Sequence, residues 1–283
     1  MTAATLSTIT VDVAGTPSTV IDTGEPAAGA SGPPLFLLHG SGPGVTALAN
    51  WRPVIPALSR TRRVVAPDQL GFGGTATGED RQYGREPWTD HAAALLDTLG
   101  LDRVDVIGNS MGGAIALSLA VARPRAVRRI VLMGSMGVAM ALPDGLDTVW
   151  GYTPGLENMR AVVDLFAYDK SLITEGLVEM RHEASLEPSV RDSWDAMFPA
   201  PRQRWVDDLA LSGAELAGLE QPVLMVHGRD DRVVPWRDSS EPLLALLSDC
   251  RLHLLAGCGH WTMIEKTDEF LAVVDPFLGA GID

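Results

Sequence analysis

The chain has 283 residues, of which 46% are hydrophobic and 20% are charged, a globular composition that excludes disordered and fibrous proteins. Its formal net charge of −14 repels phosphate backbones and anionic lipid, so we expect neither nucleic acid nor a membrane as a partner. No apolar run approaches the roughly 20 residues of a bilayer span, and the N-terminus lacks a basic region followed by an apolar stretch. A cytoplasmic protein is therefore expected.

Short apolar runs rich in β-branched residues alternate with helical stretches along the chain. This pattern predicts an α/β fold, with a mostly parallel sheet of eight strands covered by helices on both faces and an antiparallel hairpin at its start. The predicted strands are Thr8–Val13, Thr19–Asp22, Leu35–Leu38, Arg63–Ala66, Val104–Ile107, Arg128–Met133, Val223–Val226 and Arg251–Leu255. The clearest helices are Trp88–Leu99, Met111–Ala122 and Thr267–Leu278.

The alternation breaks between the sixth and seventh strands. No buried-strand pattern occurs from about Gly137 to Gly213, where amphipathic pieces such as Leu156–Phe166 and Ser171–Ser185 follow one another. An insertion at this point lies over the strand ends where open parallel sheets bind ligands, so we expect a helical cap. We accordingly divide the chain into a core of residues 1–136 and 214–283 and a cap of residues 137–213.

A serine lies between glycines in the segment GNSMGG at 108–113, which follows one predicted strand directly and opens a helix. So sharp a turn requires small residues two positions on either side of the serine, and Gly108 and Gly112 meet that requirement. The turn presents the Ser110 hydroxyl at the top of the sheet and aims a helix N-terminus at it, which favours a developing anion. An ordinary glycine-rich turn explains the glycines but not the serine, so we predict that Ser110 is a nucleophile.

A serine nucleophile needs a base and a group that orients the base. His260 stands between glycine and tryptophan in the loop after the eighth predicted strand, close to where Ser110 is expected. The acidic pair Asp230-Asp231 follows the seventh strand. Asp231 is preferred because it lies three residues past Gly228, whereas Asp230 would cap the loop or face solvent, although the choice between them stays open. Ser110, Asp231 and His260 form the predicted catalytic triad, in that chain order.

The glycine-rich loop His39–Gly44 follows the third predicted strand and exposes backbone N–H groups. We predict that the backbone N–H groups of Ser41 and Met111 form an oxyanion hole. A phosphate-binding loop is the rival interpretation, but the G-x-G-x-x-G spacing fails at Val45, so no nucleotide cofactor is expected. Two cysteines are too few for a zinc cluster, so no metal is expected either.

These segments resemble the α/β-hydrolase fold family and, more narrowly, the meta-cleavage product hydrolases of bacterial aromatic-ring degradation. The resemblance covers about residues 34–278. Beyond the triad it rests on HGSGPG at 39–44, Asn50-Trp51, AYDKSLIT at 167–174, Arg181, MFPAPRQRW at 197–205 and GHW at 259–261. The triad is shared with esterases, lipases and dehalogenases, so the other segments carry the narrower resemblance.

The resemblance implies hydrolysis of the C5–C6 carbon–carbon bond of a 2-hydroxy-6-oxohexa-2,4-dienoate, the anion formed when a catechol ring is opened. The residues it implies for substrate binding are Gly42, Asn50, Asn109, Arg181 and Trp261. Arg181 would hold the carboxylate in a bidentate fork. From the residues alone, the preferred interpretation is that Arg181 is a solvated helix residue and that Asn109 merely tolerates a tight turn. The resemblance leaves open a homodimer or higher homo-oligomer, and whether Ser110 attacks covalently or His260 activates water directly.

A pocket for the C6 substituent is expected to set substrate size. Its candidate lining residues are Met136, Leu146, Trp150, Val206 and Val234, each of which would serve equally well in core packing. The bulk of Met136 beside the nucleophile's strand favours a small substituent, and hence formate, acetate or a short branched acid as product. Two alternatives remain: a serine carboxylesterase acting on neutral esters, and a ligand-binding scaffold of the same fold with little turnover.

Overall fold

The computed structural model describes residues 6–26, 29, 32–75, 77 and 81–279. Within these residues eight strands form one sheet in the order β1-β2-β4-β3-β5-β6-β7-β8. They are β1 Thr8–Val13, β2 Thr16–Asp22, β3 Leu35–Leu38, β4 Val64–Pro67, β5 Val104–Asn109, β6 Val127–Met133, β7 Val223–Gly228 and β8 Cys250–Leu255. β2 pairs antiparallel with β1 and β4, and the other neighbouring strands run parallel. The predicted fold class, hairpin and eight strands are confirmed.

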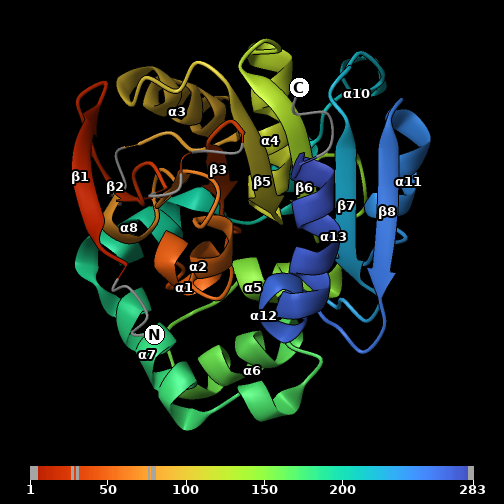
Figure 1. Ribbon diagram of the computed structural model, residues 1–283. Coiled ribbons are helices and arrows are strands. Elements are labelled where there is room, and N and C mark those ends of the chain that lie inside the picture. The colour runs from red at the N-terminus through yellow and green to blue at the C-terminus, as the bar shows by residue number, and fades with distance from the viewer. Residues whose placement is uncertain (1–5, 27–28, 30–31, 76, 78–80, 280–283) are drawn as a thin grey trace.

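Helices cover both faces of the sheet (Figure 1). On one face lie α1 Ala47–Trp51, α2 Ile55–Leu58, α12 Thr262–Glu265 and α13 Thr267–Gly279, and on the other α3 Arg85–Thr98, α4 Met111–Ala122 and α11 Ser240–Leu246, with the short turn η1 Gly73–Thr75 after β4. Side chains alternate between the two resulting cores: Phe36 of β3 belongs to the same core as Trp88 on one face, and Leu37 to the same core as Phe270 on the other. Burial on both faces explains the continuous apolar runs of the parallel strands.

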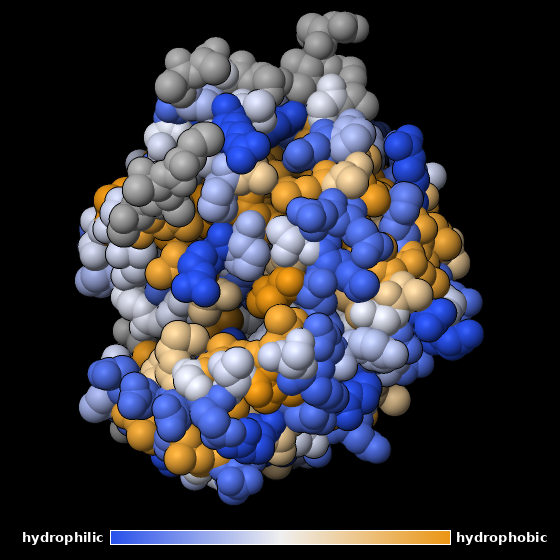
Figure 2. Space-filling view, turned by 60° about the horizontal axis from the view of Figure 1, so that its bottom comes forward, coloured by the Kyte–Doolittle hydropathy of each residue, from blue (hydrophilic) through white to orange (hydrophobic). Residues whose placement is uncertain are grey.

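The segment between β6 and β7 is helical, as its pattern predicts. It contains α5 Asp144–Trp150, α6 Leu156–Phe166, the turn η2 Lys170–Leu172, α7 Glu175–Leu186, α8 Pro188–Met197 and α9 Gln203–Leu209, and α10 Gly213–Ala217 follows. In Figure 1, α5, α6 and α7 lie beyond the end of the sheet toward which the arrows of β5 and β8 point. Figure 2 brings this end forward and shows hydrophobic side chains interspersed with hydrophilic ones across it.

One helix prediction in this segment is wrong. The expected helix Ser171–Ser185 is divided, because Thr174 adopts an extended conformation and its side chain accepts the backbone N–H of Leu177, which starts α7 at Glu175. The prediction for Leu156–Phe166 is confirmed with the same bounds. In the described part of the chain, no helix has the length and apolar character needed to cross a membrane.

Candidate active site

Ser110 occupies the turn between β5 and α4. Its φ of 54° and ψ of −120° are rare for a residue other than glycine. The backbone N–H of Ser110 donates to the carbonyl of Met133, 2.8 Å away, which anchors the turn to β6. A Cβ on Gly112 would collide with the carbonyl oxygen of Leu38, and one on Gly108 would lie 2.5 Å from the carbonyl oxygen of Gly112. Both glycines are therefore required for the turn to form.

The loops after β7 and β8 bring Asp231 and His260 together. Nδ1 of His260 lies 2.7 Å from Oδ2 of Asp231, and both side chains are buried. Oδ1 of Asp231 accepts two backbone N–H groups of its own loop, at 2.8 and 3.0 Å. Asp230 points elsewhere and accepts the backbone N–H of Gly257 at 2.9 Å. Of the two adjacent carboxylates, Asp231 is the one that contacts His260.

The environment of Asp231 keeps it ionised. Burial alone would raise the pKa of this carboxyl, but the charge of His260 and the side-chain hydrogen bonds of His227 and His260 outweigh burial and hold the pKa well below its usual range. A carboxylate at this position selects the tautomer of His260 with its proton on Nδ1, which leaves Nε2 able to accept a proton. The pair thus has the chemistry of an oriented general base.

Ser110 and His260 line one cavity, between the carboxyl ends of the strands and the helices α5, α6 and α7. The predicted site residues that line it are Ser41, Gly42, Asn50, Asn109, Ser110, Leu146, Arg181, His260 and Trp261. The lining residues that sequence analysis missed are Gly40, Val45, Phe166 and Val233. Met111 is the first residue of α4, directly after Ser110. The structure thus gathers residues from distant parts of the chain into one site.

Of the residues predicted for the substituent pocket, one lies in the wall of this cavity and four pack outside it. Met136, Trp150, Val206 and Val234 are buried but do not line the cavity, and only Leu146 of that set does. The indole N–H of Trp150 donates to Oγ of Ser41 at 2.8 Å, and its ring stacks on Phe198 with centroids 4.4 Å apart. The backbone N–H of Val234 is directed at Asp231. Position in a segment indicated proximity to the site but not the direction in which each side chain points.

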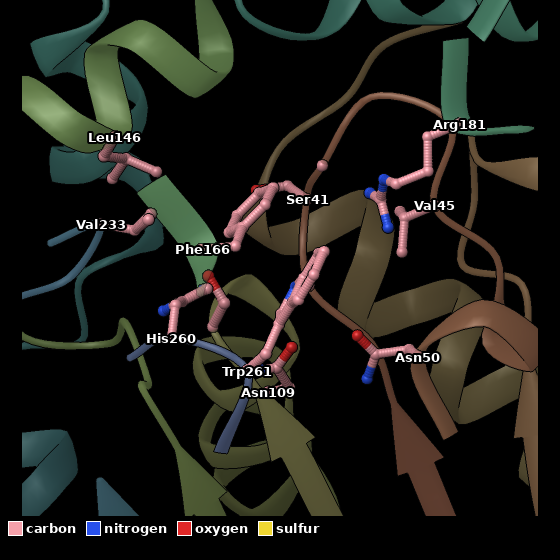
Figure 3. Close-up of a pocket in the computed structure, with 13 residues that line it drawn as sticks. Ser41, Val45, Asn50, Asn109, Leu146, Phe166, Arg181, Val233, His260 and Trp261 are labelled. Atoms are coloured by element: carbon pink, nitrogen blue, oxygen red, sulfur yellow. The ribbon is translucent and has the colours of Figure 1, made fainter. Parts of the chain in front are cut away.

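The two ends of the cavity differ in polarity (Figure 3). In this view Leu146 and Val233 lie on one side with His260, while Arg181, Asn50 and Val45 lie on the other, with Trp261 and the ring of Phe166 between them. One end is therefore apolar and the other carries amide and guanidinium donors.

Arg181 is buried, and among the described residues no carboxylate forms an ion pair with it. Its Nη2 donates to the carbonyl oxygen of Pro43 at 3.1 Å, and its Nε has no hydrogen-bond partner in the described structure. The guanidinium lies 5.8 and 5.6 Å from the ring centroids of Phe166 and Trp261. Burial lowers the pKa of Arg181 to about 10, so the group remains a cation at neutral pH. A buried cation without a counter-ion suits the binding of an anion.

The two asparagines differ in the donors they have free. Nδ2 of Asn50 is buried and has no hydrogen-bond partner among the described groups. Nδ2 of Asn109 donates one of its hydrogens to the carbonyl oxygen of Met133 at 3.2 Å. Asn50 is therefore the more available donor to a molecule in the cavity.

The last residue of α6 joins the cap to the loop that carries His260. The carbonyl oxygen of Phe166 accepts the backbone N–H of His260 at 2.8 Å and that of Trp261 at 3.3 Å. The carboxylate of Glu265 accepts the backbone N–H groups of Tyr168 and Asp169, at 2.8 and 2.9 Å. The end of α6 and the residues after it are thus hydrogen-bonded to the loop after β8 and to Glu265 of α12, beside the cavity.

Comparison with known proteins identifies the family. A family model described as the alpha/beta hydrolase fold matches residues 33–267. The chain belongs to the α/β hydrolase fold family. This α/β hydrolase is 52% identical over 250 residues to a 2-hydroxy-6-oxo-2,4-heptadienoate hydrolase of Pseudomonas putida (strain F1), covering 88% of this chain and 90% of the relative. It is 49% identical over 248 residues to a 2-hydroxymuconate semialdehyde hydrolase of Pseudomonas sp. (strain CF600), covering 88% of this chain and 87% of the relative.

Solved structures agree with the sequence relatives. The meta-cleavage product hydrolase CumD of Pseudomonas fluorescens IP01, in a serine-to-alanine variant complexed with acetates, superposes with a TM-score of 0.91. The match has 44% identity and covers 96% of this chain and 97% of CumD. The predicted membership of this α/β hydrolase among the meta-cleavage product hydrolases is confirmed.

Proposed function

We propose that this α/β hydrolase cleaves the C5–C6 bond of a 2-hydroxy-6-oxohexa-2,4-dienoate with a small C6 substituent. The observation that carries the proposal is the buried cation of Arg181, which has no carboxylate partner in the described structure and lines the same cavity as Ser110 and His260. A neutral ester gives no reason to bury such a cation. The names of the sequence relatives specify substrates of this dienoate class.

In the proposed complex the substrate spans the cavity from its polar to its apolar end. The carboxylate accepts two hydrogen bonds from Arg181, which supplies local positive charge on a protein with a net charge of −14. Further donors to the dienoate are the amides of Asn50 and Asn109, the indole of Trp261 and the backbone of Gly42. The C6 substituent faces Leu146 and Val233.

The proposed reaction has two stages, because a carbon–carbon bond breaks readily only when the departing carbon is conjugated with a ketone. First the dienol becomes a ketone by protonation at C5. Ser110, giving its proton to His260, then attacks the C6 carbonyl, and the backbone N–H groups of Ser41 and Met111 hold the oxyanion. The C5–C6 bond breaks, and its electron pair passes through the conjugated system to the C2 oxygen. The proton that His260 took from Ser110 is transferred to this product, which leaves as 2-hydroxypentadienoate, and His260 is again a base.

Release of the second product needs one water molecule. His260 takes a proton from that water, the hydroxide adds to the acyl group on Ser110, and the serine departs with the proton from His260. The product is formate, acetate or a short branched acid. Asp231 holds His260 in the required tautomer throughout, and the cap of residues 137–213 covers the reacting groups.

The test uses the visible absorbance of the yellow ring-fission products of catechol, 3-methylcatechol and 2,3-dihydroxybiphenyl. We expect the wild type to bleach the first two faster than the third, and Ser110→Ala to bleach none. Absence of bleaching together with rapid cleavage of a nitrophenyl ester would instead identify a carboxylesterase. A tight stoichiometric complex without repeated turnover would identify a binding scaffold.

A further inference from the structure

A second histidine contacts the carboxylate of Asp231. His227 belongs to β7 and its side chain is fully buried. Its Nε2 lies 3.1 Å from Oδ2 of Asp231 and 2.9 Å from the carbonyl oxygen of Val234, and its Nδ1 lies 2.7 Å from Oγ of Ser240. Because Nε2 faces two acceptors, it carries the hydrogen, and Nδ1 of the neutral ring then accepts the hydroxyl hydrogen of Ser240.

The carboxylate of Asp231 is therefore held from three directions. Oδ2 receives Nδ1–H of His260 at 2.7 Å and Nε2–H of His227 at 3.1 Å, while Oδ1 receives two backbone N–H groups. On the remaining side, a Cβ added to Gly134 would lie 2.9 Å from Nδ1 of His260 and 3.0 Å from Oδ2 of Asp231.

We propose that His227 is a positioning residue, which orients the carboxylate of Asp231 toward His260 and withdraws electron density from the oxygen that the two histidines share. Ser240, at the start of α11, holds the ring of His227. The contacts therefore run from α11 through His227 and Asp231 to His260. The proposal rests on the proposed function, because it assigns His227 a role only if the Asp231–His260 pair serves as the base.

The other buried histidines outside the pair have different partners. Nδ1 of His39 lies 2.8 Å from the carbonyl oxygen of Gly40, and its Nε2 accepts the backbone N–H of Gln69. Nε2 of His91 lies 2.9 Å from Oγ of Ser18. Among the described histidines, His227 is thus distinguished by its bond to the same oxygen as His260.

Few titratable groups surround this arrangement. Asp231 faces His227 from β7 and His260 from the loop after β8, while α11 contributes the neutral hydroxyl of Ser240. Burial raises the pKa of the Cys258 thiol, on the loop after β8, to about 12, and the charge of Asp231 contributes to this rise. The titratable groups that the described structure places against Asp231 are thus His227, His260 and Cys258.

The test compares two amide variants of nearly equal polarity. In His227→Asn the short amide reaches the position of Nδ1 and keeps the contact with Ser240, but it does not reach Asp231. In His227→Gln the amide nitrogen reaches the position of Nε2 and donates to Asp231. We expect His227→Asn to lower kcat about 10-fold with KM within about 2-fold, and His227→Gln to recover most of the loss.

The pH profile supplies the second readout. Without the hydrogen bond from His227, Oδ2 of Asp231 is more electron-rich and stabilises protonated His260, so the acid limb of kcat/KM in His227→Asn moves up by about half a pH unit. Ser240→Ala, which leaves the histidine in place but unanchored, moves kcat and the acid limb in the same direction by a smaller amount. His91→Asn, a buried histidine replaced away from the site, changes neither.

The inference is overturned if His227→Asn keeps the wild-type kcat and acid limb. It is also overturned if Asn and Gln lose activity equally and in proportion to a loss of thermal stability, because the ring then serves only packing. Should neither variant fold, Ser240→Ala decides: an unchanged profile refutes the inference. A wild-type protein that bleaches none of the ring-fission products contradicts the proposed function itself, which separates the two failures.

Discussion

Replacing Arg181 with methionine removes a buried cation while keeping an unbranched side chain. Burial lowers the pKa of Arg181 to about 10, which at about 1.4 kcal/mol per pH unit means that about 3 kcal/mol opposes the charged form at every pH below 10. The substitution relieves this penalty but loses the hydrogen bond to Pro43 and the cation–π contacts with Phe166 and Trp261, worth about 2–3 kcal/mol together. The free energy of unfolding should therefore change by less than about 1 kcal/mol.

The effect on catalysis is expected to be much larger. Removing one partner of a buried, charge-assisted bond costs about 3–5 kcal/mol, so kcat/KM for a dienoate should fall at least about 100-fold. Initial rates of bleaching of the 3-methylcatechol product measure this loss, and urea unfolding measures stability. Arg181→Lys, which keeps the charge without the planar fork, should lie between wild type and Arg181→Met.

A neutral nitrophenyl acetate provides the internal control. Its hydrolysis does not require a carboxylate clamp, so Arg181→Met should leave that rate within about 3-fold of wild type. Parallel losses toward the dienoate and the ester would refute the assignment of Arg181 to the carboxylate. So would a loss of dienoate activity that merely follows a loss of stability in urea.

Three further predictions concern single side chains. Asp231→Asn should lower kcat by about 10⁴-fold and Asp230→Asn by less than 10-fold, in the same bleaching assay. Trp150→Phe keeps an aromatic ring but loses the N–H bond to Ser41, so kcat should fall about 10-fold with little change in KM. Burial lowers the pKa of His91 to about 4, so the folded state resists protonation; the resulting stability is present above pH 6.5 and is lost as pH falls toward 4. When the free energy of unfolding in urea is measured at several pH values, His91→Gln should reduce its decrease between pH 6.5 and 4 by up to about 3 kcal/mol.

The fold was predictable where burial is uniform along an element. Strands such as β3 pack on both faces and therefore appear as continuous apolar runs. The start of β2 at Thr16 was missed because Thr16-Pro17-Ser18 has no apolar run, and its strand conformation comes from pairing with β1. The break before α7 depends on one hydrogen bond of Thr174, which a periodicity of 3.6 residues does not reveal.

The residues of the candidate site also differ in how far the sequence alone predicts them. The turn at Ser110 is a local structure with local requirements, so its glycines and serine point to it directly. The cavity wall depends on packing. Trp150 and Phe166 are each the last residue of a helix, but the indole N–H of Trp150 donates to Oγ of Ser41 outside the cavity wall, whereas Phe166 lines the cavity. His227 also resembled an ordinary histidine at a strand end, because its partner four residues later folds back onto it.

The carbonyl group of Phe166 limits which parts of the chain can change when substrate preference changes. It holds the main chain of both His260 and Trp261, so a shift of the chain near residue 166 displaces the histidine as well. Leu146 of α5 and Arg181 of α7 also line the cavity, but in the described structure their main chains form no hydrogen bond with His260 or Trp261. Changes in preference for the C6 substituent should therefore accumulate around Leu146 in α5, whereas Arg181 and the backbone near residue 166 are constrained by the reaction whatever the substituent.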